Sequence, residues 1–113
     1  MATLDLDPRH LDLVRSLAAT HLTDAEVWAY GSRVVGGAHA GSDLDMVVRN
    51  RTDPLVPCAG LAAFRAALSE SNLPILTDVR DWALIPPEFR RRIEAHHVTV
   101  WACRRAPNTE CGQ

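Results

Sequence analysis

The stretch YGSRVVGGAHAGSDLDMVV, from Tyr30 to Val48, decides how this chain is expected to fold. It holds four glycines and ends in two carboxylates, Asp43 and Asp45, which lie two residues apart where an apolar strand begins. In a strand, residues i and i+2 point to the same side, about 6–7 Å apart. Two carboxylates whose oxygens approach to about 5 Å repel each other by roughly 3 kcal/mol at an effective dielectric constant of about 20. The stretch therefore requires either a protonated carboxyl group or a positive charge between the acids.

The residues around the two acids allow two interpretations. Leu44, Met46 and Val48 are expected on the face opposite Asp45, where they would build a core. An all-oxygen site with few protein ligands suits Mg²⁺, above all when substrate phosphates complete the coordination of the ion. The alternative is that Ser42-Asp43 forms a turn and that Asp45 is merely exposed.

The first half of the stretch suggests an anion site. Glycine at position 31 would let a phosphate approach the backbone, and Ser32 offers a hydroxyl group next to it. The amides that open a short helix at Ser32 would face the same anion. An ordinary strand-to-helix turn also favours glycine and serine, so both interpretations stay open. Two other phosphate motifs are excluded, because the chain has no GxGxxG pattern and no lysine; its twelve basic residues are all arginine.

A third acid, Asp78, lies inside the apolar segment PILTDVRDW, where a strand is predicted over 75–79. Aspartate is disfavoured in strands, so its presence there requires a reason. The metal hypothesis predicts that Asp78 lies on a strand next to the one that Asp43 and Asp45 begin. Asp81, just past the predicted strand, is expected to cap a turn.

Composition limits the remaining possibilities. A chain of 113 residues with 47% hydrophobic residues fits one compact domain. The net charge of −2 gives no sign of direct nucleic-acid binding, and the missing lysine excludes Schiff-base chemistry. Three widely spaced cysteines without a CxxC pair predict neither a zinc site nor a disulfide framework. No signal peptide or long apolar run is visible, so a cytoplasmic protein without membrane contact is expected.

Helical and strand patterns alternate along the chain, which predicts an α/β (α+β) fold with a largely covered sheet. Outside the opening stretch, the paired histidines His96-His97 are expected to cap a helix end. The run RRR at 90–92 is expected to form a solvated helix face or to meet an acidic partner or RNA. The predicted helices cover 8–20, 32–35, about 60–70 and a segment that opens at Pro86-Pro87; the predicted strands cover 26–30, 44–49, 75–79 and 98–102.

Two segments together resemble a known family. The pattern GSR-x-x-G followed by GSDLD resembles the signature of the polymerase-β-like nucleotidyltransferase superfamily, and most closely that of its minimal members, the MNT proteins. The segment DVRDWALIPPEFRRRIEAHHVTVW is similar to their C-terminal half. The resemblance covers roughly residues 25–101. It implies a nucleotidyltransferase fold with a mixed sheet of about four strands. The length predicts a single domain over 1–103, and Pro107, Asn108 and Gly112 predict a flexible tail over 104–113.

The resemblance also implies how the substrate would be held. Gly31 and Ser32 would hold the β- and γ-phosphates of a nucleoside triphosphate, with Ser42 beside them. Arg33 matches the family's GSR motif and would either contact phosphate or form a structural salt bridge. Many relatives carry a second basic residue where this chain has Val35, which implies fewer phosphate contacts here.

The same resemblance implies a metal-dependent reaction. Asp43 and Asp45 would bind two Mg²⁺ ions, and Asp78 would bind the ion nearer the attacking hydroxyl group and accept its proton. ATP would be the substrate, and AMP would pass to a hydroxyl group. MNT proteins are typically antitoxins of HEPN-domain RNase toxins, so a HEPN-type toxin in a hetero-oligomer is the implied acceptor. The alternatives are an antitoxin that acts by binding alone and a transferase that modifies a small molecule of the aminoglycoside type.

Overall fold

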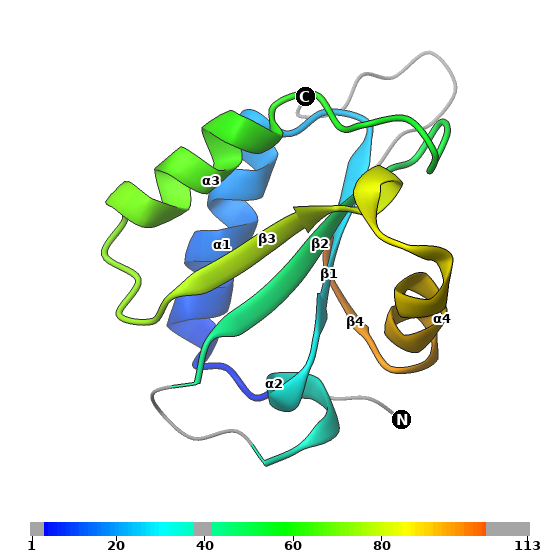
Figure 1. The fold of residues 1–113 in the computed structure, drawn as a ribbon. Helices are drawn as coiled ribbons and strands as arrows, with labels where there is room; N and C mark the ends of the chain where they lie inside the picture. Colours follow the sequence, from blue (N-terminus) through cyan, green and yellow to red (C-terminus); the bar gives the residue numbers. More distant parts are fainter. Residues whose placement is uncertain (1–3, 38–41, 104–113) are drawn as a thin grey trace.

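A four-stranded sheet in the order β3-β2-β1-β4 organises the chain (Figure 1). The computed structural model describes residues 4–37 and 42–103. The elements follow one another as α1 (Pro8–His21), β1 (Ala25–Tyr30), α2 (Ser32–Val35), β2 (Leu44–Asn50), α3 (Leu61–Glu70), β3 (Thr77–Asp81), the 3₁₀ turn η1 (Trp82–Leu84), α4 (Pro87–Ala95) and β4 (Val98–Ala102).

The sheet is mixed. Strand β1 pairs antiparallel with both β2 and β4, whereas β2 and β3 run parallel. A parallel pair needs a long crossover connection, and α3 supplies it. The mixed four-stranded sheet with helices packed on it confirms the predicted fold class.

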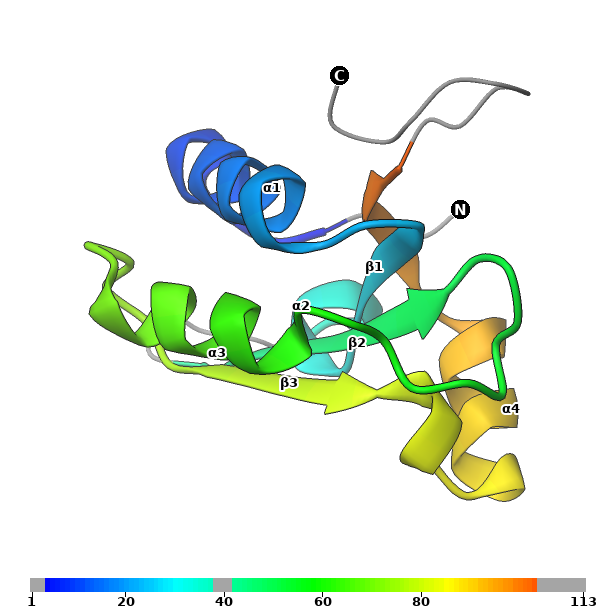
Figure 2. The ribbon, with the colours of Figure 1, turned by 90° about the horizontal axis from the view of Figure 1, so that it is seen from above.

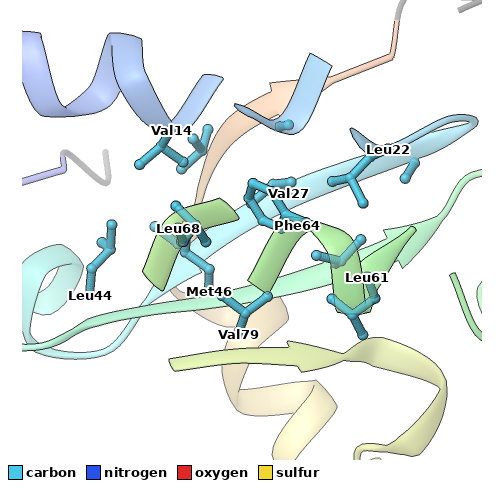
Figure 3. Close-up of a cluster of buried hydrophobic side chains, with 14 residues drawn as sticks. Val14, Leu22, Val27, Leu44, Met46, Leu61, Phe64, Leu68 and Val79 are labelled. Atoms are coloured by element: carbon cyan, nitrogen blue, oxygen red, sulfur yellow. The ribbon is translucent and has the colours of Figure 1, made fainter. Parts of the chain in front are cut away.

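One face of the sheet is covered by α1 and α3 (Figure 2). Helix α1 begins as the sequence predicts, because the Asp7 side chain accepts a hydrogen bond from the Arg9 backbone N–H and Pro8 follows at the first helical position. Phe64 of α3 is fully buried between the helices and the strands. Figure 3 shows this core, which is apolar throughout. The residues labelled there are Val14, Leu22, Val27, Leu44, Met46, Leu61, Phe64, Leu68 and Val79.

The opposite face carries a smaller core under η1 and α4. Trp28 and Trp82 meet edge to face with their ring centroids 5.3 Å apart. The other buried members of this layer are Tyr30, Val47, Ile85 and Ile93. This second core covers only part of its face, and the chemistry described below lies beside it.

One sequence expectation needs correction. Strand β3 spans Thr77–Asp81 instead of 75–79, because its pairing with β2 begins at Leu44 opposite Thr77 and leaves Leu76 75% exposed. Cys103 is disulfide-bonded and Cys58 is free; a single bridge is not the disulfide framework against which the cysteine spacing argued. The predicted tail over 104–113 lies outside the described residues. Within the described part of the chain, no helix is long and apolar enough to cross a membrane.

Candidate active site

Asp45 and Asp78 lie side by side on one face of the sheet. They are direct partners in the parallel pairing of β2 with β3, and paired residues point to the same side. On the opposite face, Leu44 and Met46 are fully buried, as the alternation along β2 predicts. Strand pairing thus joins an acid from the opening stretch to one from far along the chain.

The charges of three acids meet at Asp45. Burial raises the pKa of Asp45 above its ordinary value, and the charges of Asp78 and Asp43 raise it further. Asp43 itself is exposed and directly precedes β2. The mutual repulsion expected from the sequence is therefore present in the fold, and Asp78 is part of it.

Arg80 supplies the positive charge that the acids require. Its Nε donates to Oδ2 of Asp78 over 3.2 Å, and its charge lowers the pKa of Asp45, partly offsetting the effect of the neighbouring acids. The sequence interpretation missed this residue. The signal was its position two residues after Asp78 in the same strand, which places both side chains on one face.

Gly31 brings the backbone of the predicted phosphate turn against the acids. Its φ of +81° lies in the region that favours glycine, and a Cβ added there would stand 2.5 Å from Oδ2 of Asp45. A side chain at this position would therefore occupy the space beside the Asp45 carboxylate. The two halves of the opening stretch meet at this point, with Ser32 starting α2 next to Gly31.

Arg33 ties the ends of the turn together. Its guanidinium is buried and donates to the backbone carbonyl oxygen of Ser42 over 2.8 and 3.1 Å. The same group donates to the carbonyl oxygen of Asp5 over 2.8 Å. These bonds give Arg33 a structural role through carbonyl groups, and they fix the residue just before Asp43. A contact of Arg33 or Ser42 with phosphate stays a prediction.

A cavity of about 670 Å³ adjoins Gly31 on the side of α4. Its walls are largely apolar and include Val35, Phe89 and Ile93, and Tyr30 forms the end near the acids. Arg91 and Arg92 of the RRR run also line it, whereas Arg90 is bonded to the carbonyl oxygens of Trp82 and Ala83. The sequence interpretation did not foresee this cavity, since it depends on how α4 packs against the sheet.

The acids have the chemistry of a Mg²⁺ site, although their side chains are not arranged around an ion. In the part of the chain that the structure describes, no group of three His, Cys, Asp or Glu side chains is placed to hold a metal. The donors at this edge are carboxylate oxygens, which Mg²⁺ prefers, and the missing Cβ of Gly31 leaves space beside one of them. The residues therefore fit the ion, and metal binding by Asp43, Asp45 and Asp78 remains a prediction.

Two neighbouring polar groups serve the fold, as predicted. Asp81 is buried and accepts hydrogen bonds from the backbone N–H groups of Ala83 and Cys58, so it caps the turn after β3. His97 stacks on Trp28 with ring centroids 3.8 Å apart, and its Nδ1 lies 3.0 Å from the carbonyl oxygen of Ile93 near the end of α4. Neither side chain is counted with Asp43, Asp45 and Asp78 as part of the candidate site.

Comparison with known proteins identifies the family. No protein-family profile matches the chain. Over 99 residues, it is 36% identical to the probable protein adenylyltransferase MntA of Haemophilus influenzae, and the match covers 88% of this chain and 85% of that protein. The mixed sheet and the motif from Tyr30 to Val48 are consistent with this relationship. The chain belongs to the MntA family of minimal nucleotidyltransferases.

Proposed function

We propose that this protein is a Mg²⁺-dependent nucleotidyltransferase that moves AMP from ATP onto a hydroxyl group of a partner protein. In this proposal it acts in the cytoplasm as the antitoxin of a HEPN-type RNase toxin. The observation that carries the proposal is the meeting of Asp45, Asp78 and the Gly31 turn at one end of the sheet. The similarity to a protein named as a protein adenylyltransferase supports the reaction class.

Each residue of the site has a separate task in this reaction. Gly31, Ser32 and Ser42 hold the phosphates of ATP, while Arg33 positions the turn. Asp43, Asp45 and Asp78 would hold two Mg²⁺ ions, which neutralise phosphate charge when bound. Asp78 also accepts the proton of the attacking hydroxyl group. The hydroxyl oxygen then bonds to the α-phosphorus of ATP while the bond to pyrophosphate breaks.

The position of β3 favours an acceptor from another protein. This strand forms the edge of the sheet, and the side chain of Asp78 is 45% exposed. An approaching protein segment can therefore reach the proposed base from the open edge. In the proposal, the acceptor hydroxyl group therefore belongs to a partner protein that docks at this edge in a hetero-oligomer.

The cavity beside Gly31 has room for the rest of the nucleotide. Its volume of about 670 Å³ lies within the usual range for small-molecule sites, about 300–1,000 Å³. Phosphates at Gly31 would place the adenosine next to the apolar wall of Val35, Phe89 and Ile93. In the proposal, ATP thus lies along one surface that runs from the acids to α4.

The test is transfer of labelled AMP. The purified protein is incubated with Mg²⁺, α-labelled ATP and a co-expressed HEPN-type toxin, and mass spectrometry locates the added AMP. Wild type should label the toxin, and the double variant Asp43→Asn/Asp45→Asn should not. Asp12→Asn, which changes an exposed acid on α1, is the matched control and should label as wild type does. Equal labelling by the double variant would refute the assignment.

Two alternatives give different results in the same assay. An antitoxin that acts by binding alone would inhibit the toxin and leave its mass unchanged; the complete set of acids argues against it. A transferase of the aminoglycoside type would move the label to an added aminoglycoside and leave the toxin unlabelled. The similarity to a protein named as a protein adenylyltransferase favours a protein acceptor over this second alternative.

A further inference from the structure

Arg80 is bound to a group that the proposed reaction needs. Its Nε lies 3.2 Å from Oδ2 of Asp78, and the two side chains are 51% and 45% exposed. Ion pairs this exposed contribute little to folding stability. The fold therefore does not depend on the pair, and Arg80 can change partner at small cost.

The surroundings of Arg80 place it between the acids and the cavity. Its guanidinium carbon lies 5.8 Å from the centroid of the Phe89 ring, a distance within the range of cation–π contacts. Phe89 in turn meets Tyr30 edge to face at 5.6 Å, and both aromatic residues line the cavity beside Gly31. The charge of Arg80 also lowers the pKa values of Asp45 and Tyr30. Arg80 therefore contacts both an acid, Asp78, and a residue of the cavity wall, Phe89.

We propose that Arg80 binds two partners in turn: Asp78 in the metal-free protein, and the phosphates of ATP once Mg²⁺ holds the acids. This inference rests on the proposed function. A divalent cation at the carboxylates competes with the guanidinium for Asp78 and repels it. The released guanidinium stays near Asp45, whose carboxylate lies against Gly31 of the phosphate turn, and its planar array of N–H donors suits phosphate oxygens. Arg80 is thus a substrate-binding residue that protects the acids until metal arrives.

Metal binding without nucleotide tests the first half of the exchange. Mn²⁺ serves as the probe, and its affinity is measured by electron paramagnetic resonance for wild type and Arg80→Gln. Removing the competing cation should tighten Mn²⁺ binding about twofold to fivefold, the range that exposed ion pairs contribute. Arg9→Gln is the matched control, because Arg9 forms an exposed ion pair with Asp7 at the same 3.2 Å and lies on α1. Its Mn²⁺ affinity should equal that of wild type.

Nucleotide binding tests the second half. With saturating Mn²⁺, Arg80→Gln should bind the non-hydrolysable analogue α,β-methylene-ATP about tenfold more weakly, because one charge-assisted hydrogen-bonding group is lost. Arg80→Lys keeps the charge and should recover part of this affinity. The inference is overturned if Arg80→Gln binds Mn²⁺ no more tightly than wild type, or if its affinity for the analogue is unchanged.

The same data separate this inference from the proposed function. If wild type binds Mn²⁺ and transfers AMP while Arg80→Gln behaves as Arg9→Gln does, only the role of Arg80 is refuted. If wild type neither binds Mn²⁺ nor labels the toxin, the proposed function falls and the inference falls with it. Circular dichroism of each variant confirms that the exposed substitutions leave the fold intact.

Discussion

The two faces of the sheet use the same strands for opposite purposes. On the side of α1 and α3, Leu44 and Met46 join a closed apolar core that excludes charge. On the side of α4, Asp45 of the same strand meets Asp78 and Arg80 beside a partly open layer. Because side chains along β2 alternate between the two faces, core residues and acidic residues follow one another in the same strand. A rigid apolar layer on one face can thus hold repelling charges on the other.

The largest effects are expected from substitutions of two neighbouring residues on β2: one on the acidic face should reduce AMP transfer, and one on the core face should reduce stability. Asp45→Asn should lower AMP transfer at least about 100-fold, the scale of losing a group that stabilises transition-state charge, and should leave the fold intact. Met46→Ala should lower the free energy of unfolding by about 2–5 kcal/mol, because it opens a cavity in the core. Transfer assays and urea unfolding measure the two effects. The comparison breaks if Met46→Ala, while folded, loses transfer as severely as Asp45→Asn.

Two glycines with positive φ sharpen the comparison. An added Cβ at Gly60 would collide with the backbone carbonyl oxygen of His21, whereas at Gly31 the nearest atoms are those of the Asp45 side chain. Gly60→Ala should therefore destabilise the fold by about 2 kcal/mol or more and leave transfer by the folded protein unchanged. Gly31→Ala should cost about 1–3 kcal/mol, because φ of +81° with ψ of −157° is a backbone conformation that essentially only glycine adopts. It should also reduce transfer by displacing the carboxylate. Unfolding curves and transfer rates check both variants: a folded Gly60→Ala that loses transfer, or a folded Gly31→Ala that keeps it, would contradict this division.

The smallest expected effect is the pH dependence of stability. The pKa of Asp45 is raised above its ordinary value of 3.8, so its contribution to stability is favourable at low pH and is lost as pH rises through the folded-state pKa. In metal-free buffer, Asp45→Asn should therefore melt slightly higher than wild type at pH 7, and the difference should vanish below about pH 3.8. Thermal unfolding across this range checks the sign.

Alternation and turn residues made much of the fold predictable. The sequence places Leu44 and Asp45 on opposite faces without reference to the rest of the chain, and the cap at Asp7 marks the start of α1. The bounds of β3 were misplaced because Ile75 and Leu76 are apolar but precede the pairing with β2.

The site was less predictable because its parts meet through pairing and packing. The sequence suggested that Asp78 is functional, but its position beside Asp45 depends on the register of β2 with β3. Arg80 follows from the same register and was overlooked as an ordinary charged residue. The two interpretations of Arg33 could not be separated from sequence, since its carbonyl partners lie at Ser42 and Asp5. The cavity depends on the packing of α4, which no local pattern reveals.

The transfer rate of Asp78→Asn tests the central claim most directly, because only the pairing of β3 with β2 joins this residue to the opening motif. The assay follows labelled AMP from ATP onto the co-expressed toxin, with wild type and Asp53→Asn, an exposed acid after β2, as references. The account predicts that Asp78→Asn folds normally but transfers AMP at least about 100-fold more slowly than wild type. Asp53→Asn should transfer AMP at the rate of wild type. A rate for folded Asp78→Asn close to that of wild type would contradict the account.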